Sequence, residues 1–201
     1  MVTMPVREIW AGNARYSVDP LYSGPQTIRL AGEPTTIGWA LREVLIAATL
    51  CNHATASHCG DKWQFSGDDS DQALLATAID GGIDADTLRA SAPRIAELHC
   101  TADTQATLHQ CPDGADIYVK GEPEQVLQGC DAMLDTHGRR WPLEATDVLE
   151  RAAAMRARGL SVVAFARGKL AQVRPLTATD CQSGLLLIGL VGLLIAPLTL
   201  R

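Results

Sequence analysis

Two spacings of apolar residues run along the chain, and together they predict a mixture of helices and strands. Apolar side chains every three or four positions indicate a helix that buries one face, whereas short apolar runs between turn residues indicate strands. The helical spacing predicts helices at 37–52, 68–79, 84–90, 125–130 and 143–158. The short runs predict strands at 6–10, 26–30, 63–66, 94–99, 106–110, 117–119, 160–166 and 186–193. Short strands therefore alternate with helices.

The segment from Leu185 to Leu200 is apolar enough to suggest a membrane helix. A bilayer span needs about 20 apolar residues, and Pro197 interrupts this segment. Gly184, just before the segment, and Gly189 and Gly192 within it would also weaken a helix. We therefore predict a buried strand at 186–193, with a small membrane-anchored protein built on 185–200 as the less favoured alternative.

Length and charge narrow the class of protein. A chain of 201 residues is long enough for one well-buried domain. Its net charge of −6 argues against nucleic acid as the main partner, because such proteins usually carry a basic face. The six cysteines show no C-x-x-C spacing, which is typical of reduced cytosolic thiols. A metal site at His53, His58 and Cys59 is less favoured than plain helix-end and loop residues.

The stretch Tyr118–Glu124 predicts a strand, a glycine turn and a new helix. Pro123 fits the first turn of that helix because it has no N–H to satisfy. Lys120 stands at the turn beside Gly121, and a cation next to a glycine backbone suits a phosphate or another anion. On its own, this short pattern is weak evidence for a site.

Four further segments surround this turn in a recognisable order. The five are Leu50-Cys51-Asn52-His53-Ala54, Gly67 to Leu74, Lys120-Gly121, Gly159 to Ala166 and Ile188 to Leu193. This series resembles the nucleotide-binding (N) domain of P-type cation-transporting ATPases, over about 10–195. The phosphorylation motif D-K-T-G-T that precedes this domain in the family is absent.

The resemblance implies an α+β fold, with a twisted, mainly antiparallel sheet of six or seven strands flanked by helices. It implies one nucleotide-binding domain at 1–195 and a hinge remnant at 196–201. The ligand would be ATP, as Mg-ATP in the parent pump, and the partners would be the pump's phosphorylation and actuator domains. The chain would be a soluble cytoplasmic part of an integral membrane protein. Alone it should not hydrolyse ATP, because the acceptor aspartate lies outside this segment.

The resemblance also assigns the site residues. Lys120 and Gly121 match the lysine and glycine at the floor of the adenine slot. Asp71 takes the position of a glutamate that binds the adenine edge, and Asp68 that of the preceding acid. Cys100 falls where the family has a phenylalanine that stacks on adenine.

Ser161 falls where the family has an arginine, and the stretch after Cys100 lacks the family's lysine. Loss of base stacking alone is worth about 1–3 kcal/mol. We therefore expect weakened ATP affinity. The alternative is a regulatory or interaction module that keeps the fold without binding nucleotide, which Cys100, Gln105 and Ser161 favour.

Overall fold

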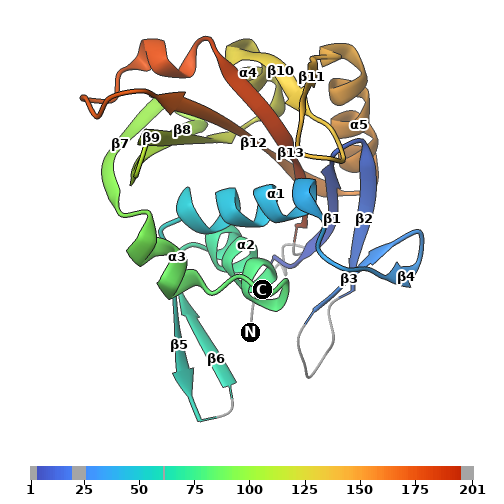
Figure 1. The fold of residues 1–201 in the computed structure, drawn as a ribbon. Coiled ribbons are helices and arrows are strands. Elements are labelled where there is room, and N and C mark those ends of the chain that lie inside the picture. The colour runs from blue at the N-terminus through green and yellow to red at the C-terminus, as the bar shows by residue number, and fades with distance from the viewer. Residues whose placement is uncertain (1–3, 20–25, 61, 196–201) are drawn as a thin grey trace.

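The computed structural model describes residues 4–19, 26–60 and 62–195 of the chain. A large twisted sheet forms the body of the molecule, with helices on both of its faces (Figure 1). Its eleven strands are β1 (Val6–Ala11), β2 (Ala14–Asp19), β3 (Thr27–Leu30), β4 (Glu33–Pro34), β7 (Arg94–Thr101), β8 (Thr104–Cys111), β9 (Gly114–Gly121), β10 (Cys130–Leu134), β11 (Arg140–Pro142), β12 (Leu160–Leu170) and β13 (Leu185–Leu194). A separate hairpin consists of β5 (Thr55–Cys59) and β6 (Lys62–Ser66).

The main path of the sheet runs in the order β4-β3-β2-β1-β13-β12-β9-β8-β7. Every pair on this path is antiparallel, and β10 joins the first residues of β13 as the one parallel pair among the described strands. The α+β class and the mainly antiparallel sheet are thus confirmed. The predicted count of six or seven strands is wrong.

Three of the missed strands, β4, β5 and β11, have identifiable physical reasons. β4 and β11 have only two and three residues, too few to show alternation. β5 is largely exposed and polar, so it shows no alternation of apolar and polar residues. His58 and Cys59 belong to this strand rather than to the predicted loop. The centroids of the His58 and Trp63 rings are 3.7 Å apart. The predicted helix at 125–130 is a single turn, after which β10 starts at Cys130.

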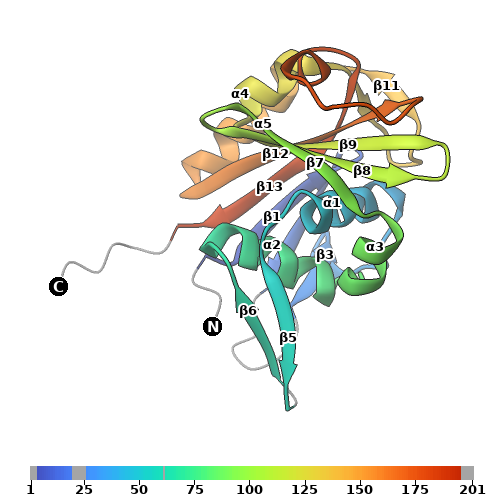
Figure 2. The same cartoon turned by 90° about the vertical axis from the view of Figure 1, so that its left-hand side faces the viewer.

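The helices divide between the two faces of the sheet, as Figure 2 shows. α1 (Trp39–Leu50), α2 (Asp69–Asp80) and α3 (Ala85–Ser91) cover one face, and α4 (Pro123–Val126) and α5 (Ala145–Ala157) cover the other. Two 3₁₀ turns, η1 (Leu127–Gly129) and η2 (Ala178–Cys181), complete the second face. Alternate side chains of a strand serve the two cores: Phe165 packs under α1, and its neighbour Ala164 packs on the α5 side.

The apolar segment near the C-terminus is strand β13, as predicted. It lies in the middle of the sheet between β1 and β12. No helix within the described residues is both long and apolar enough to cross a bilayer. Gly189 lets β1 approach, because a Cβ there would lie 2.3 Å from the Trp10 carbonyl oxygen. The proposed hinge at 196–201 lies outside the described residues.

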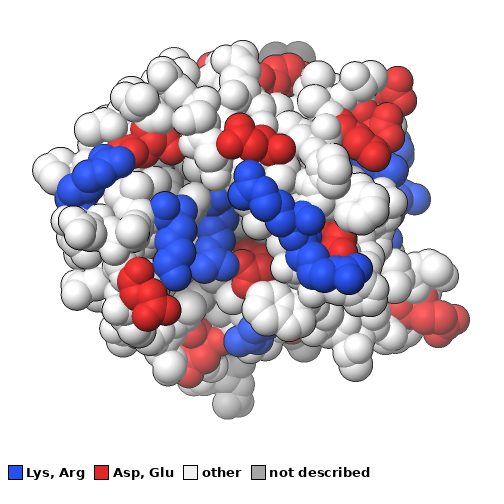
Figure 3. Space-filling model, turned by 45° about the horizontal axis from the view of Figure 1, so that its top comes forward, with Lys and Arg blue, Asp and Glu red and all other residues white. Residues whose placement is uncertain are grey.

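Charged side chains of both signs are interspersed on the surface in Figure 3. Several charged side chains of the described residues form ion pairs. Arg156 contacts Glu122 and Glu124, and Arg167 contacts Glu43 and Asp116. The face in view therefore alternates in sign rather than presenting one continuous charge.

A buried histidine makes the stability of the fold depend on pH. His109 is 1% exposed; its Nδ1 donates to the Ala92 carbonyl oxygen at 2.9 Å, and its Nε2 accepts from the Thr107 hydroxyl at 3.0 Å. Burial is the main cause that lowers the pKa of His109 below 6.5. Its stabilising contribution is therefore complete above about pH 6.5 and falls at lower pH, where only the unfolded chain binds the proton.

We expect urea unfolding to show a drop in stability between pH 7.5 and pH 5.5 that is smaller in a His109→Gln variant. The exposed His137, changed to Gln, is the matched control and should keep the wild-type slope. Equal slopes in wild type and His109→Gln would contradict this assignment.

Candidate functional site

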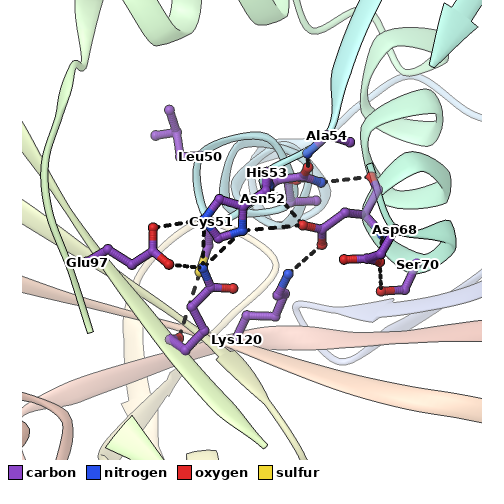
Figure 4. Close-up of polar contacts among 12 residues, drawn as sticks. Leu50, Cys51, Asn52, His53, Ala54, Asp68, Ser70, Glu97 and Lys120 are labelled. Carbon is purple, nitrogen blue, oxygen red and sulfur yellow. Dashed lines mark hydrogen bonds and ion pairs between the residues drawn. The ribbon is translucent and has the colours of Figure 1, made fainter. Parts of the chain in front are cut away.

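Lys120, a predicted site residue, lies where the C-terminal end of α1 and the N-terminal end of α2 meet the sheet (Figure 4). β9 alternates between the two cores, with Val119 in the α5-side core and Tyr118 in the α1-side core. Lys120 therefore shares the α1 side with Tyr118. The residues after α1 bring His53 to this place, and the first turn of α2 brings Asp71.

Lys120 and Asp71 form a buried ion pair. Lys120 Nζ lies 2.5 Å from Asp71 Oδ1, and the two side chains are 14% and 1% exposed. The other carboxylate oxygen of Asp71 accepts the backbone N–H of His53 at 2.8 Å. Both oxygens of Asp71 thus already have a partner within the protein, and at 1% exposure this carboxylate is closed to a ligand.

Asp68 fixes the start of α2 rather than touching Lys120. Its carboxylate accepts the backbone N–H of Asp71 at 2.9 Å and the Ser70 hydroxyl at 2.7 Å, as an N-cap does. Burial opposes the shift, but these hydrogen bonds and the charge of Lys120 lower the pKa of Asp68. Asp68 thereby orients the turn that presents Asp71.

A second set of polar side chains extends the cluster towards solvent. His53 Nε2 lies 2.8 Å from Glu97 Oε2, and Gln105 Nε2 donates to Glu97 Oε1 at 3.1 Å. Arg94 also contacts Glu97, at 3.1 Å. Burial opposes the shift, but His53 and then Arg94 lower the pKa of Glu97. The sequence did not single out this network, since its members come from separate elements.

Arg89 and Arg94 also hold the end of α1 in place. Arg94 donates to the carbonyl oxygens of Leu50 and Asn52 at 2.7 and 2.6 Å, and Arg89 donates to that of Thr49 at 3.1 Å. Cations at the C-terminal end of a helix satisfy its free carbonyls. These two arginines therefore position His53, and their N–H donors are largely engaged by protein groups.

One row of side chains crosses four strands on this face. His99 pairs with Gln105, Gln105 pairs with Lys120, and Lys120 pairs with Phe165. Directly paired residues lie about 5 Å apart and point to the same face. His99 is exposed, so this row ends in an accessible aromatic ring.

Cys100, which follows His99, lies on the opposite side of the sheet. It packs against the α5-side core, and its sulfur lies 2.7 Å from that of Cys181 in η2. The structure therefore does not bring Cys100 to Lys120. Its neighbour His99 lies on the Lys120 face, as Glu97 does, because adjacent strand residues point to opposite faces.

Gly121 permits close packing within the protein. A Cβ there would lie 2.5 Å from the Asp103 carbonyl oxygen, at the tip of the β7–β8 hairpin. The helix that follows is one turn long, and its Glu122 and Glu124 both bind Arg156. With two carboxylates at its start, this turn is unsuited to an anion.

Ser161 lies on the same side as Lys120 but apart from the cluster. It alternates with Val163 and Phe165, which pack towards α1, and it pairs with Leu193 on β13. Gly121, the last residue of β9, pairs with Ala164, three residues away. Three residues of strand span about 10 Å, within the length of a nucleotide but beyond contact with Lys120.

Of the six predicted residues, the structure thus groups Asp68, Asp71 and Lys120, places Gly121 next to them, leaves Ser161 apart and puts Cys100 on the other face. A cavity of about 470 Å³ lies elsewhere, between the β1–β2 turn, the β10–β11 hairpin and α5. None of the six predicted residues lines it.

Comparisons with known proteins agree with the motifs. Residues 40–197 match the family described as P-type ATPase, cytoplasmic domain N. The cation-transporting ATPase pma1 of Synechocystis sp. is 32% identical over 209 residues, which cover 96% of this chain and 22% of the relative. The probable cation-transporting ATPase F of Mycobacterium tuberculosis is 31% identical over 168 residues, covering 82% of this chain and 18% of the relative. The chain thus spans about a fifth of these relatives, and it belongs to the cytoplasmic N-domain family of P-type ATPases.

Proposed function

We propose that this chain is the ATP-binding domain of a P-type cation-transporting ATPase and delivers ATP to a phosphorylation domain outside this chain. The observation that carries the proposal is the row His99–Gln105–Lys120 beside the buried Lys120–Asp71 pair. It combines an exposed ring, an amide and a fixed cation on one face. A purine base, its hydrogen-bonding edge and its phosphates need these three kinds of group.

Lys120 supplies the positive charge in this proposal, and Asp71 positions it. Both oxygens of Asp71 are bound by Lys120 and the His53 N–H. The adenine edge would therefore meet the side-chain oxygen of Gln105, whose Nε2 already donates to Glu97, and the base would stack on His99. Histidine is one of the side chains on which bases stack in other sites.

We expect ATP binding to be weak. The charge of Lys120 is largely neutralised by Asp71, and Arg94 and His53 face Glu97. Ser161 carries no charge. A phosphate chain would thus find few free cations within reach and one carboxylate, Glu97, nearby. In the parent pump the ligand would be Mg-ATP, on the cytoplasmic side of the membrane, and the phosphorylation and actuator domains would be the partners.

The test is an NMR titration of the chain with ATP, with and without Mg²⁺. We expect saturable binding in the millimolar range, with shifts confined to residues around Lys120 and His99. A His99→Phe variant should bind about tenfold more tightly, because a larger ring gains roughly 1–2 kcal/mol of stacking. His99→Ala should bind more weakly than wild type.

Cys100→Ser is the matched control, since this neighbouring residue lies on the other face and should leave affinity unchanged. Tighter binding in a Cys100→Phe variant but not in His99→Phe would assign the stacking position to Cys100 instead. If the folded wild type and His99→Phe both fail to bind ATP at about 10 mM, the proposed function is wrong.

The second candidate, a regulatory module without nucleotide binding, is favoured by one observation. Asp71, the carboxylate paired with Lys120, is 1% exposed, and each of its oxygens already has a protein partner. Absence of ATP binding by a folded chain would make this the leading interpretation.

A further inference from the structure

Two cysteines far apart in the sequence meet on the α5 side of the sheet. Cys100 comes from the edge strand β7 and Cys181 from η2, 81 residues later, and their sulfur atoms are 2.7 Å apart. An S–S bond is about 2.05 Å long, so the sulfurs would need to approach by only about 0.7 Å. Bond formation would therefore disturb the fold little.

The backbone around Cys181 is fixed by contacts other than the sulfur pair. A Cβ on Gly129 would lie 2.1 Å from the Cys181 carbonyl oxygen, so the two chains pack closely there. Thr177 and Asp180 form a reciprocal capping box that holds η2, and Arg174 donates two hydrogen bonds to Asp180. Cys100, for its part, sits in the β7–β8 ladder between the paired residues His99 and Thr101.

We propose that Cys100 and Cys181 form a redox-sensitive disulfide by exchange with a small disulfide such as glutathione disulfide. The Cys100 thiolate attacks one sulfur of glutathione disulfide and releases one glutathione. The Cys181 thiolate then attacks the Cys100 sulfur and releases the second. Two protein thiols and one glutathione disulfide become one protein disulfide and two glutathione thiols.

The surroundings of the pair suit this exchange. Both residues are partly exposed, so a small disulfide can reach them. A hydrogen bond from Cys181 is the main cause that lowers the pKa of Cys100, and the same contact raises that of Cys181. By contrast, burial raises the pKa of Cys51 to about 11 and that of Cys130 to about 12, which leaves these thiols unreactive.

The bond would join two parts of the fold that the sheet itself does not connect. β7 pairs only with β8 among the described strands and so forms one edge of the sheet. Cys100 directly precedes the hairpin tip that packs on Gly121. A disulfide would therefore fasten the edge strand, and with it the hairpin beside Lys120, to η2. This inference does not depend on ATP binding.

The experiment incubates the chain in a buffer rich in glutathione disulfide and maps the bonds by peptide mass spectrometry. A Cys59→Ser background removes the exposed thiol of Cys59. We expect one internal disulfide between Cys100 and Cys181, absent in Cys100→Ser and in Cys181→Ser and retained in Cys111→Ser. Closing a loop of this length should raise Tm by about 10 °C, reversed by a reducing agent.

Three results would overturn the proposal. The first is a folded background protein in which both thiols stay open to alkylation after oxidation. The second is a bond from either cysteine to another partner. The third is a mapped Cys100–Cys181 bond that leaves Tm and amide exchange in β7 unchanged. That result would show that the bond does not stabilise the attachment of β7 to η2.

Discussion

Replacing Lys120 with methionine is expected to lower the free energy of unfolding by about 3–5 kcal/mol. The change keeps much of the side chain's volume but leaves the carboxylate of Asp71, 1% exposed, without its cationic partner. An unpaired charge in such a place is costly, because little water reaches it. Because methionine keeps this volume, the loss should come from the charge rather than from packing.

A double-mutant cycle separates these causes. Asp71→Asn in the Lys120→Met background removes the orphaned charge and should recover a large part of the lost stability, although each single change is destabilising. Urea unfolding of the four proteins measures this coupling. If the losses in free energy of unfolding of the two single variants simply add in the double variant, the Lys120–Asp71 ion pair does not stabilise the fold. The double variant also offers a site without the cation for the ATP titration.

Changing Gly189 to alanine is expected to destabilise the chain by about 3 kcal/mol, at the upper end for overpacking. The new Cβ would lie 2.3 Å from the Trp10 carbonyl oxygen and 2.9 Å from Val44 Cγ2. The first contact is with backbone, so no side-chain rotation relieves it. β1 and β13 would have to separate at the centre of the sheet.

Gly192, in the same strand, provides the matched control. A Cβ there would meet Leu160 Cδ1 at 2.7 Å, the far end of a flexible side chain that can turn away. Gly192→Ala should therefore cost about 1 kcal/mol or less. Thermal or urea unfolding of both variants measures the two losses of stability. Equal losses would contradict the view that glycine is needed at position 189 for the close approach of β1 to β13.

The elements that were predicted well are those with several turns or several alternations. α1, α2 and α5 were found because each carries an apolar stripe over three turns or more, and β13 because it is a long buried run. The passage from β9 into α4 was found from its local chemistry, but Lys120 and Gly121 are the last residues of the strand rather than a turn. Such features depend on neighbours in the sequence.

The parts that were missed depend on partners far away in the chain. The face on which Cys100 lies is set by the register of β7 against β8, and a shift of one residue exchanges His99 and Cys100. No local pattern states that register. Likewise, the pairing of Lys120 with Asp71 joins β9 to α2 across 49 residues. Whether Asp71 faces a ligand or a lysine cannot be read from its own helix.

The central position of β13 has a consequence for synthesis. Its neighbours β1 and β12 are each the last strand of a four-strand half of the main path. Among the strands that the structure describes, only β13 joins the two halves. Because translation proceeds from the N-terminus at about 5–20 residues per second, β1 leaves the ribosome on the order of ten seconds before β13, the strand on its other side from β2. Until then both half-sheets expose an unpaired edge, which is where chains aggregate. Chaperone demand should therefore peak just before 185–194 emerges, and a ribosome that stalls there would hold two halves ready to pair with the wrong chain.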